Sequence, residues 1–222
     1  QGVYRETVIA ASYENHLRDF GDFQIEFDNF HTTHSPENRE FCERIFTAME
    51  KAGALRTKPV PQLWCPHDKM FLPDRFVRGA CPSCHAPDQY GDSCDQCGAT
   101  YAPSDLSQAQ CAICGATPEQ RASEHIFFHI ELYRKYLETW LPDHVARDVA
   151  NKLLEWFEPG VELRPWDISR DAPYFGFEIP GHPSKYFYVW LDAPIGYMAS
   201  FKNWCDRHGE DFETFWNAPE TE

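Results

Sequence analysis

Four cysteines between residues 81 and 97 have the types and the spacing of a metal site. Cys81 and Cys84 are separated by two residues, and Cys94 and Cys97 repeat that spacing after a gap of nine residues. Two intervening residues let both sulfurs of one turn face the same ion, and two such turns complete a tetrahedron around zinc. Because four thiolates leave no open position, we predict a structural zinc ion, with iron in the same geometry as the alternative.

A second group of candidate ligands flanks the first. Cys111 and Cys114 form a further pair with two intervening residues, and this pair needs two more ligands to hold an ion. The segment Cys65-Pro-His67-Asp68 can supply them, since an Asp oxygen or a His nitrogen completes a zinc tetrahedron beside three sulfurs. We therefore predict a second metal site from Cys65, Cys111, Cys114 and either His67 or Asp68; the alternative is three cysteines that hold no metal.

The composition indicates a reducing, cytoplasmic setting. Six of the nine cysteines fall between residues 81 and 114, a pattern typical of metal binding rather than of disulfides. No apolar run approaches the ~18 residues of a membrane span, and no secretory signal opens the chain, so we expect no membrane contact. Cys42 and Cys205 stand alone in helical patterns, and we expect both to be packing residues.

The charge balance limits the classes of partner. The formal net charge is −15, which argues against a broad phosphate-binding surface, although one local patch can still contact nucleic acid. Only seven of the 20 basic residues are Lys. An acid-rich, Lys-poor surface indicates a saline source as one interpretation, and an ordinary acidic protein as the other.

The first element that we expect to position these residues is a helix. Ser35 followed by Pro36 predicts a helix start, because Ser caps the first turn and Pro tolerates its first position. Apolar residues recur every four positions from Phe41, and Gly53 predicts the end of this helix. Before it, the strict alternation of residues 23–27 predicts a short strand.

The rest of the chain alternates between irregular and regular structure. Residues 55–118 are rich in Pro, Gly, Asp and Cys, which predicts short elements that need the metal as a staple. Residues 131–158 return to helix, and residues 175–179 and 185–191 read as strands. The last of these is a nearly continuous apolar run, typical of a buried parallel strand, and it leads into a helix that ends near Gly209. This order predicts an α/β fold with its ligand site at the carboxyl end of that strand.

Several stretches, together with the cysteine pairs, make the chain resemble the methionyl-tRNA synthetase family. The clearest is Lys185-Tyr-Phe-Tyr-Val-Trp-Leu-Asp-Ala-Pro-Ile-Gly-Tyr-Met198, and another is Phe71-Leu-Pro-Asp-Arg-Phe-Val77 just before the first cysteine pair. The remaining stretches are 27–35, 90–92 and 166–178. The match extends over essentially the whole chain in one register.

The resemblance implies a fold and an activity. It implies a class I Rossmann-like nucleotide-binding core, formed by residues 1–52 and 170–222 and interrupted by a connective-peptide domain with zinc knuckles at 53–169. The family activates methionine with ATP to methionyl-adenylate and transfers it to tRNA(Met). The family's two ATP signature motifs do not occur in the sequence, and Gln1 is not an initiator Met. We therefore expect a central piece of a methionine–tRNA ligase, inactive without the remaining parts of its parent chain.

The resemblance also assigns substrate-facing residues. The unbranched, polarizable side chain of methionine favours an aromatic pocket, and the family's pocket corresponds to Trp190, Ala193, Pro194 and Tyr197. From the residues alone, Trp190 and Tyr197 read as core aromatics.

Three further residues have both a catalytic and a structural interpretation. By resemblance Arg170 stabilises charge during activation, whereas by its flanking acids it reads as an ion-paired surface residue. His31 and His34 precede a helix start, where a neutral imidazole either faces bound nucleotide or substrate or only hydrogen-bonds within the loop. Family members with two zinc ions have a cysteine where Asp68 stands, so this chain departs from their pattern.

Two other readings remain open at this point. A freestanding zinc-ribbon adaptor that binds RNA or protein would explain the cysteines, but it would not need the buried strand at 185–191. Another class I synthetase would share the core, but the spacing of Trp190 and Tyr197 favours methionine.

Overall fold

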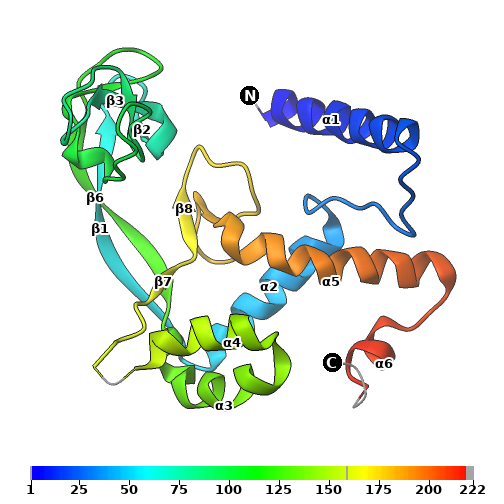
Figure 1. Cartoon of the computed structure of the whole chain (residues 1–222). Coiled ribbons are helices and arrows are strands. Elements are labelled where there is room, and N and C mark those ends of the chain that lie inside the picture. Colours follow the sequence, from blue (N-terminus) through cyan, green and yellow to red (C-terminus); the bar gives the residue numbers. More distant parts are fainter. Residues whose placement is uncertain (1, 159, 219–222) are drawn as a thin grey trace.

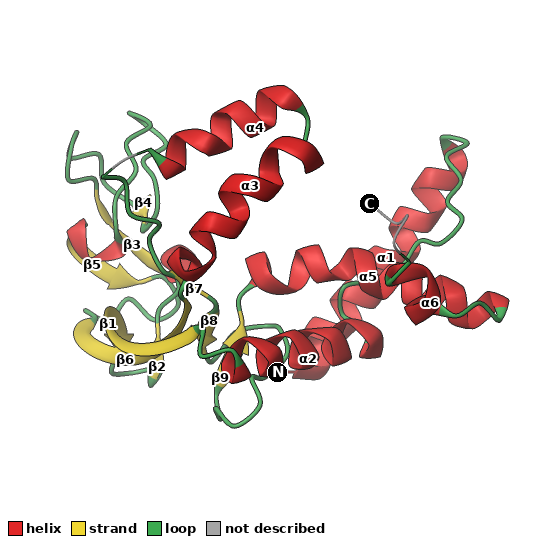
Figure 2. Cartoon of the chain, turned by 90° about the horizontal axis from the view of Figure 1, so that it is seen from below, coloured by secondary structure: helices red, strands yellow, loops and turns green. Residues whose placement is uncertain are grey.

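The computed structural model describes residues 2–158 and 160–218, with side chains from Arg5 onward. A group of helices forms the body of the molecule, and a long pair of strands extends from it and carries a small cysteine-rich tip (Figure 1). Two more helices cover the other end of this strand pair (Figures 1 and 2).

The first two helices are α1 (Gly2–Asp22) and α2 (Pro36–Lys51). The predicted start of α2 is confirmed, because the Ser35 side chain accepts a hydrogen bond from the Asn38 N–H at 3.2 Å. Its predicted end is confirmed as well, since Gly53 adopts a φ of +66°, which glycine reaches without strain.

The predicted strand at residues 23–27 is wrong. These residues form a turn and a loop between α1 and α2. No strand of the described chain pairs with them, and the Phe27 ring instead packs edge-on against Phe20 of α1, at 4.9 Å between ring centroids. The other apolar members of the alternation are exposed, Phe23 to 79% and Ile25 to 46%, so the alternating polarity here does not mark a strand.

A long antiparallel strand pair is the feature that the sequence predicted least well. Strands β1 (Leu55–Cys65) and β6 (Glu119–Phe128) pair along their length, from Leu55 opposite Phe128 to Trp64 opposite Glu119. The short strands β2 (Met70–Phe71) and β7 (Trp166–Asp167) extend this sheet in the order β2-β1-β6-β7. We refer to β1 and β6 as the arm.

The tip of the arm contains the cysteine pairs. Its three-stranded antiparallel sheet has the order β4-β3-β5, formed by Gln89–Tyr90, Val77–Ala80 and Ser107–Cys111. Its small buried cluster consists of Cys65, Leu72, Val77, Leu106 and Cys111. The expectation of short elements is therefore confirmed for the tip but wrong for the arm.

Helices return between residues 130 and 157, as predicted. The 3-10 turn η3 (Ile130–Tyr133) leads into α3 (Arg134–His144), and α4 (Arg147–Leu154) is followed by the 3-10 turn η4 (Glu155–Phe157). The expected apolar stripe along α3 is present but remains largely at the surface, where the Tyr136 and Trp140 rings stack at 6.4 Å.

The body is completed by a strand pair and two helices. Strands β8 (Ser169–Asp171) and β9 (Lys185–Phe187) pair antiparallel, and α5 (Val189–His208) and α6 (Phe212–Trp216) follow. Helix α5 ends at Gly209, whose φ is +74°, as the sequence predicted.

The strands predicted at 175–179 and 185–191 are both corrected. Residues 175–179 contribute only one isolated bridge, between Glu178 and Tyr186. The second strand ends at Phe187, and the Leu191 and Asp192 N–H groups turn back to the Tyr188 carbonyl. The apolar run therefore combines a short strand with a helix start, and all strand pairs in the described chain are antiparallel rather than parallel.

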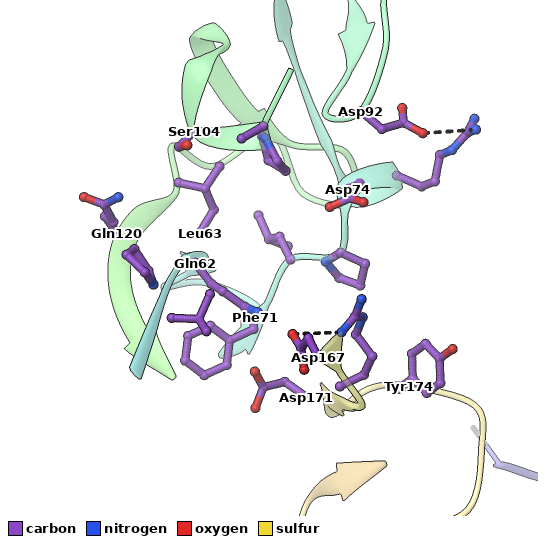
Figure 3. A pocket seen from close by; sticks show the side chains of 18 of the residues that line it. Gln62, Leu63, Phe71, Asp74, Asp92, Ser104, Gln120, Asp167, Asp171 and Tyr174 are labelled. Atoms are coloured by element: carbon purple, nitrogen blue, oxygen red, sulfur yellow. Dashed lines mark ion pairs between the residues drawn. The ribbon is translucent and has the colours of Figure 1, made fainter. Parts of the chain in front are cut away.

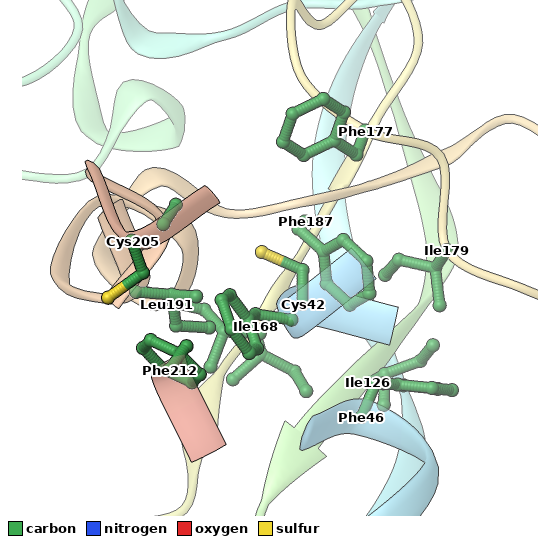
Figure 4. Close-up of a cluster of buried hydrophobic side chains, with 13 residues drawn as sticks. Cys42, Phe46, Ile126, Ile168, Phe177, Ile179, Phe187, Leu191, Cys205 and Phe212 are labelled. Atoms are coloured by element: carbon green, nitrogen blue, oxygen red, sulfur yellow. The ribbon is translucent and has the colours of Figure 1, made fainter. Parts of the chain in front are cut away.

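A buried cluster holds helices α2, α5 and α6, the base of the arm and strand β9 together (Figure 4). Phe187 is fully buried at its centre, against Phe46 of α2, while Ile126 of β6 and Ile168 bring in the arm. Cys42 and Cys205 lie in the same cluster, which confirms that they are packing residues. Burial, with Asp192 and Glu43 nearby, raises the pKa of Cys42 to about 12, so it stays an inert thiol.

Among the described residues, no helix is both long and apolar enough to span a bilayer.

The excess of acidic residues should make stability depend on salt. With a formal net charge of −15, added salt screens repulsion between carboxylates over a Debye length of about 10 Å at 0.1 M. We expect the melting temperature of the zinc-loaded protein to rise between low and molar potassium chloride. A flat or falling melting temperature would contradict a surface adapted to saline conditions.

Candidate functional site

The first cysteine group has the geometry of a tetrahedral metal site. The sulfurs of Cys81, Cys84, Cys94 and Cys97 all lie within 4.8 Å of one another. The Sγ atoms of Cys81 and Cys97 are 3.8 Å apart, and those of Cys84 and Cys94 are 3.6 Å apart. A tetrahedron with Zn–S bonds of about 2.3 Å places its sulfurs about 3.8 Å apart. The four donors therefore fit zinc, as the sequence predicted.

Backbone N–H groups prepare these sulfurs for metal binding. The N–H groups of Ser83 and Cys84 point at Cys81 Sγ, at 3.3 and 3.5 Å. Burial raises the pKa of this thiol, but these hydrogen bonds outweigh it and lower the pKa to about 6. Since the thiolate is the form that binds metal, the turn favours the ligating state.

The second group is equally compact and includes Asp68. Cys65 and Cys114 Sγ are 3.4 Å apart, and Asp68 Oδ2 lies 3.3 Å from the Sγ atoms of both Cys65 and Cys111. His67 is 72% exposed and instead places its Nδ1 atom 3.0 Å from the other oxygen of Asp68. Of the two ligands left open by the sequence, the structure brings Asp68 into the group and leaves His67 outside it.

The same turn geometry recurs at all four half-sites. A residue with positive φ follows the second donor each time, at Lys69 (+53°), His85 (+61°), Gly98 (+71°) and Gly115 (+75°). Asp68 thus occupies, in backbone geometry, the position that the second cysteine holds in the other three turns. Its N–H group also points at Cys65 Sγ, at 3.3 Å, as Cys84 does at Cys81.

Arg170 faces a cavity between the tip and the body of the molecule (Figure 3). The cavity has a volume of about 420 Å³. The tip contributes Asp74, Arg75 and Asp92, and the body contributes Arg170, Tyr174 and Tyr188. Segments nearly a hundred residues apart thus form one site, which no local motif could indicate.

The Arg170 side chain is held from three sides. Its Nη1 atom pairs with Asp167 Oδ2 at 3.1 Å and donates to the Ser169 carbonyl at 2.7 Å. Its guanidinium carbon lies 3.4 Å from the centre of the Tyr188 ring. The ion pair expected from the flanking acids is therefore present with Asp167, whereas Asp171 pairs with Lys185.

Two carboxyl groups have raised pKa values, one beside Arg170 and one in α5. Burial and the neighbouring Asp92 raise the pKa of Asp74 on the tip side, an effect that the Arg170 charge partly offsets. Burial raises the pKa of Asp192, in the first turn of α5, to about 6. Carboxyls perturbed in this way are typical of binding sites, although structural acids show the same shifts.

The residues assigned to a methionine pocket share one face of α5. Trp190, Ala193, Pro194 and Tyr197 recur at helical spacing, opposite the buried Leu191, Ile195 and Ala199. Trp190 is 61% exposed and Tyr197 is 82% exposed, so neither is a core residue. Trp190 lies in the first helical turn rather than at a strand end, and Tyr197 lies further along α5. The described cavities are not lined by these four residues.

The loop before α2 lies directly against α5. A Cβ atom at Gly196 would approach Thr33 Cγ2 to 2.7 Å, so a larger residue there would force the Thr33 side chain to shift. His31 faces Glu37 at 3.4 Å, and the His34 ring stacks on Phe177. Both histidines also line a second cavity of about 570 Å³ beside α1, so the structural and the binding interpretation both remain compatible with their surroundings.

His125 is the polar residue that the motifs did not single out. It is 1% exposed, and both ring nitrogens face carboxylates. The acids around Arg170 were visible in the sequence, but their partner on β6 was not.

Comparison with known proteins places the chain in a class. A family model described as tRNA synthetases class I (M) matches residues 1–222. The chain therefore belongs to this family of class I tRNA synthetases.

Solved structures of methionyl-tRNA synthetases share the fold. Free Mycobacterium tuberculosis methionyl-tRNA synthetase is 19% identical, with a TM-score of 0.58 over 98% of this chain and 39% of that one. Two structures of the same synthetase, bound by or in complex with methionyl-adenylate, are 20% and 19% identical. Their TM-scores are 0.52 and 0.53, over 87% and 91% of this chain and 34% and 35% of theirs. The chain thus spans about two fifths of these relatives or less, and the likeness establishes the mixed helix-and-sheet fold.

Proposed function

We propose that the chain is part of a cytoplasmic methionine–tRNA ligase that activates methionine with ATP and transfers it to tRNA(Met). The observation that carries this proposal is the family match over all 222 residues. The exposed aromatic face of α5 supports it, since methionine binding needs accessible aromatic rings.

The proposal divides the chain at the two points where the arm leaves and rejoins the body. Residues 1–52 and 170–222 belong to the catalytic core, and residues 53–169 are an insertion. In support, β1 leaves the body just after α2, and the chain returns beside β8 through β7. The cysteine groups would hold zinc, which would fix the fold of the tip rather than take part in the reaction.

Within the core, the side chains have separate roles. The face from Trp190 to Tyr197 binds the methionine side chain. Arg170 stabilises negative charge as the phosphoryl group is transferred, because its guanidinium is held beside an open cavity. The tip lies across the same cavity, where the tRNA end would have to enter.

Methionine-dependent exchange between ATP and pyrophosphate tests the proposal. The full product of the gene that carries this sequence should catalyse exchange with methionine. The 222-residue chain alone should not, because the family's ATP signature motifs are not in it. Exchange with a different amino acid would overturn the methionine assignment, and no exchange by the full product would favour a zinc-ribbon adaptor.

Replacing Trp190 should weaken methionine binding specifically. In the full protein, Trp190→Ala should raise the KM for methionine about tenfold or more, equivalent to ~1.4 kcal/mol or more, with little change in the KM for ATP. Because Trp190 is largely exposed, the variant should stay folded. Trp156→Ala, which removes an equally exposed ring from η4, is the matched control. An unchanged methionine KM in Trp190→Ala would remove Trp190 from the pocket.

A further inference from the structure

A buried histidine joins the arm to the strand that carries Arg170. His125 of β6 places Nδ1 2.7 Å from Asp167 Oδ2 and Nε2 3.0 Å from Asp171 Oδ2. Those two acids lie on β7 and β8, on either side of Arg170. The His125 ring is therefore clamped between two carboxylates at the base of the arm.

The two carboxylates favour a proton on each ring nitrogen. A neutral imidazole has one N–H group and one lone pair, so its lone pair would face a carboxylate oxygen. With both nitrogens protonated, each carboxylate accepts a hydrogen bond. The amide nitrogen of Gln62 on β1 also lies 2.8 Å from His125 Nε2, and because two donors do not face each other, a charged ring implies that this amide is turned with its oxygen toward the ring.

The surrounding charges are consistent with a charged ring. Burial, the largest single influence, lowers the pKa of His125, but the hydrogen bonds to both acids outweigh it and raise the pKa above its ordinary value. The same contacts help to lower the pKa values of Asp167 and Asp171. The groups that face this cluster from the neighbouring elements are Gln62, Ser123, Arg170 and Lys185. Lys58 of β1 also lies opposite His125 across the ladder, with its Nζ atom over the Phe127 ring.

The contact extends directly to Arg170. The Asp167 oxygen that receives the His125 Nδ1 hydrogen bond, Oδ2, is also the oxygen that pairs with Arg170 Nη1 at 3.1 Å. Figure 3 shows this ion pair at the edge of the cavity. If the Asp167 carboxylate became more mobile, the Arg170 guanidinium that pairs with it would therefore become more mobile as well.

We propose that His125 is a positioning residue whose charged imidazolium fixes Asp167 and thereby orients Arg170 in the cavity. It also connects the arm to the body through charge, in addition to the apolar packing of Ile126. The importance of Arg170 for the reaction rests on the proposed function, but the positioning itself does not.

The protonation state is tested first, on the chain as it stands. Nitrogen NMR of the histidine side chains, followed through a pH titration, should show that both nitrogens of His125 stay protonated above the ordinary histidine pKa of about 6.5. As the pH rises through the raised pKa of His125, the ring should lose its proton and the protein its added stability. A His125 ring that is already neutral at the ordinary histidine pKa would overturn the proposal.

The positioning role is tested by the reactivity of Arg170. Phenylglyoxal modification, followed by mass spectrometry, should proceed several-fold faster at Arg170 in His125→Gln than in the wild type, relative to exposed Arg164. Ile126→Val, on the same strand, weakens the core without touching the carboxylates, and it should leave the ratio unchanged. An unchanged ratio in folded His125→Gln would overturn the proposal.

If His125→Gln does not fold, the same question can be tested on the wild-type protein. Its Arg170-to-Arg164 reactivity ratio should rise as pH passes the His125 titration seen by NMR, and a constant ratio would overturn the proposal. None of these measurements uses methionine or ATP. Absence of methionine-dependent exchange would therefore count against the proposed function alone.

Discussion

Removal of metal should unfold the tip of the arm while the helical body stays folded. The tip has a very small apolar cluster, and two of its five buried members are themselves candidate ligands, Cys65 and Cys111. Structural zinc contributes an apparent ~10–16 kcal/mol in small zinc domains, far more than so small a cluster can supply. The body has its own core around Phe187 and needs no ion.

Hydrogen exchange with a strong chelator measures this effect. Backbone amides of residues 77–111 should lose their protection, whereas those of α2 and α5 should keep theirs. Cys81→Ser should reproduce the loss without a chelator. Cys42→Ser is the matched control, because Cys42 is equally buried but lies in the body. A tip that stays protected after metal is fully removed would show that zinc is not structural.

The parts of the fold that were predictable from sequence are those fixed by local chemistry. The cap at Ser35 and the stops at Gly53 and Gly209 depend on one side chain or one φ angle, and all three are confirmed. The grouping of the first four cysteines was predictable for the same reason, since two turns of a few residues set its geometry. Such features depend only on residues that are close in the sequence.

The arm was missed because its pairing is not local. Pro59 and Pro61 argue against a strand, since proline cannot donate to a neighbour. They are tolerated because β2 pairs only with Trp64 and Cys65, which leaves one side of β1 free at both prolines. The partner strand lies some sixty residues away, and no pattern within β1 could reveal it.

The cavity and its polar network were missed for a related reason. The sequence showed Asp167 and Asp171 beside Arg170 but gave no sign that His125 lies between them. The apolar run from residue 185 was likewise ambiguous, because a buried strand and the buried face of a helix have the same composition. Burial at Leu191, Ile195 and Ala199, four residues apart, resolves it in favour of a helix.

A second metal ion should be bound beside the first, with Asp68 as its oxygen ligand. The distances from Asp68 Oδ2 to two sulfurs are both 3.3 Å, close to the ~3.5 Å of an S–Zn–O edge in a tetrahedron. Contacts with Cys114 and His67 hold the pKa of this carboxyl well below its ordinary value, so it is present as the carboxylate. We therefore expect elemental analysis to find two zinc ions per chain.

Substitutions at this site test whether Asp68, rather than the adjacent His67, is the ligand. Asp68→Ala should reduce the content to one zinc per chain, as should the double change Cys111→Ser, Cys114→Ser. Asp68→Cys should retain both ions, because the turn already has the geometry of the three cysteine turns. His67→Ala should also retain two ions but weaken the second site about 10- to 100-fold, the usual effect of losing a residue that orients a ligand. If the wild-type chain contains one zinc ion and all four variants contain the same amount, then Cys65, Cys111 and Cys114 hold no metal.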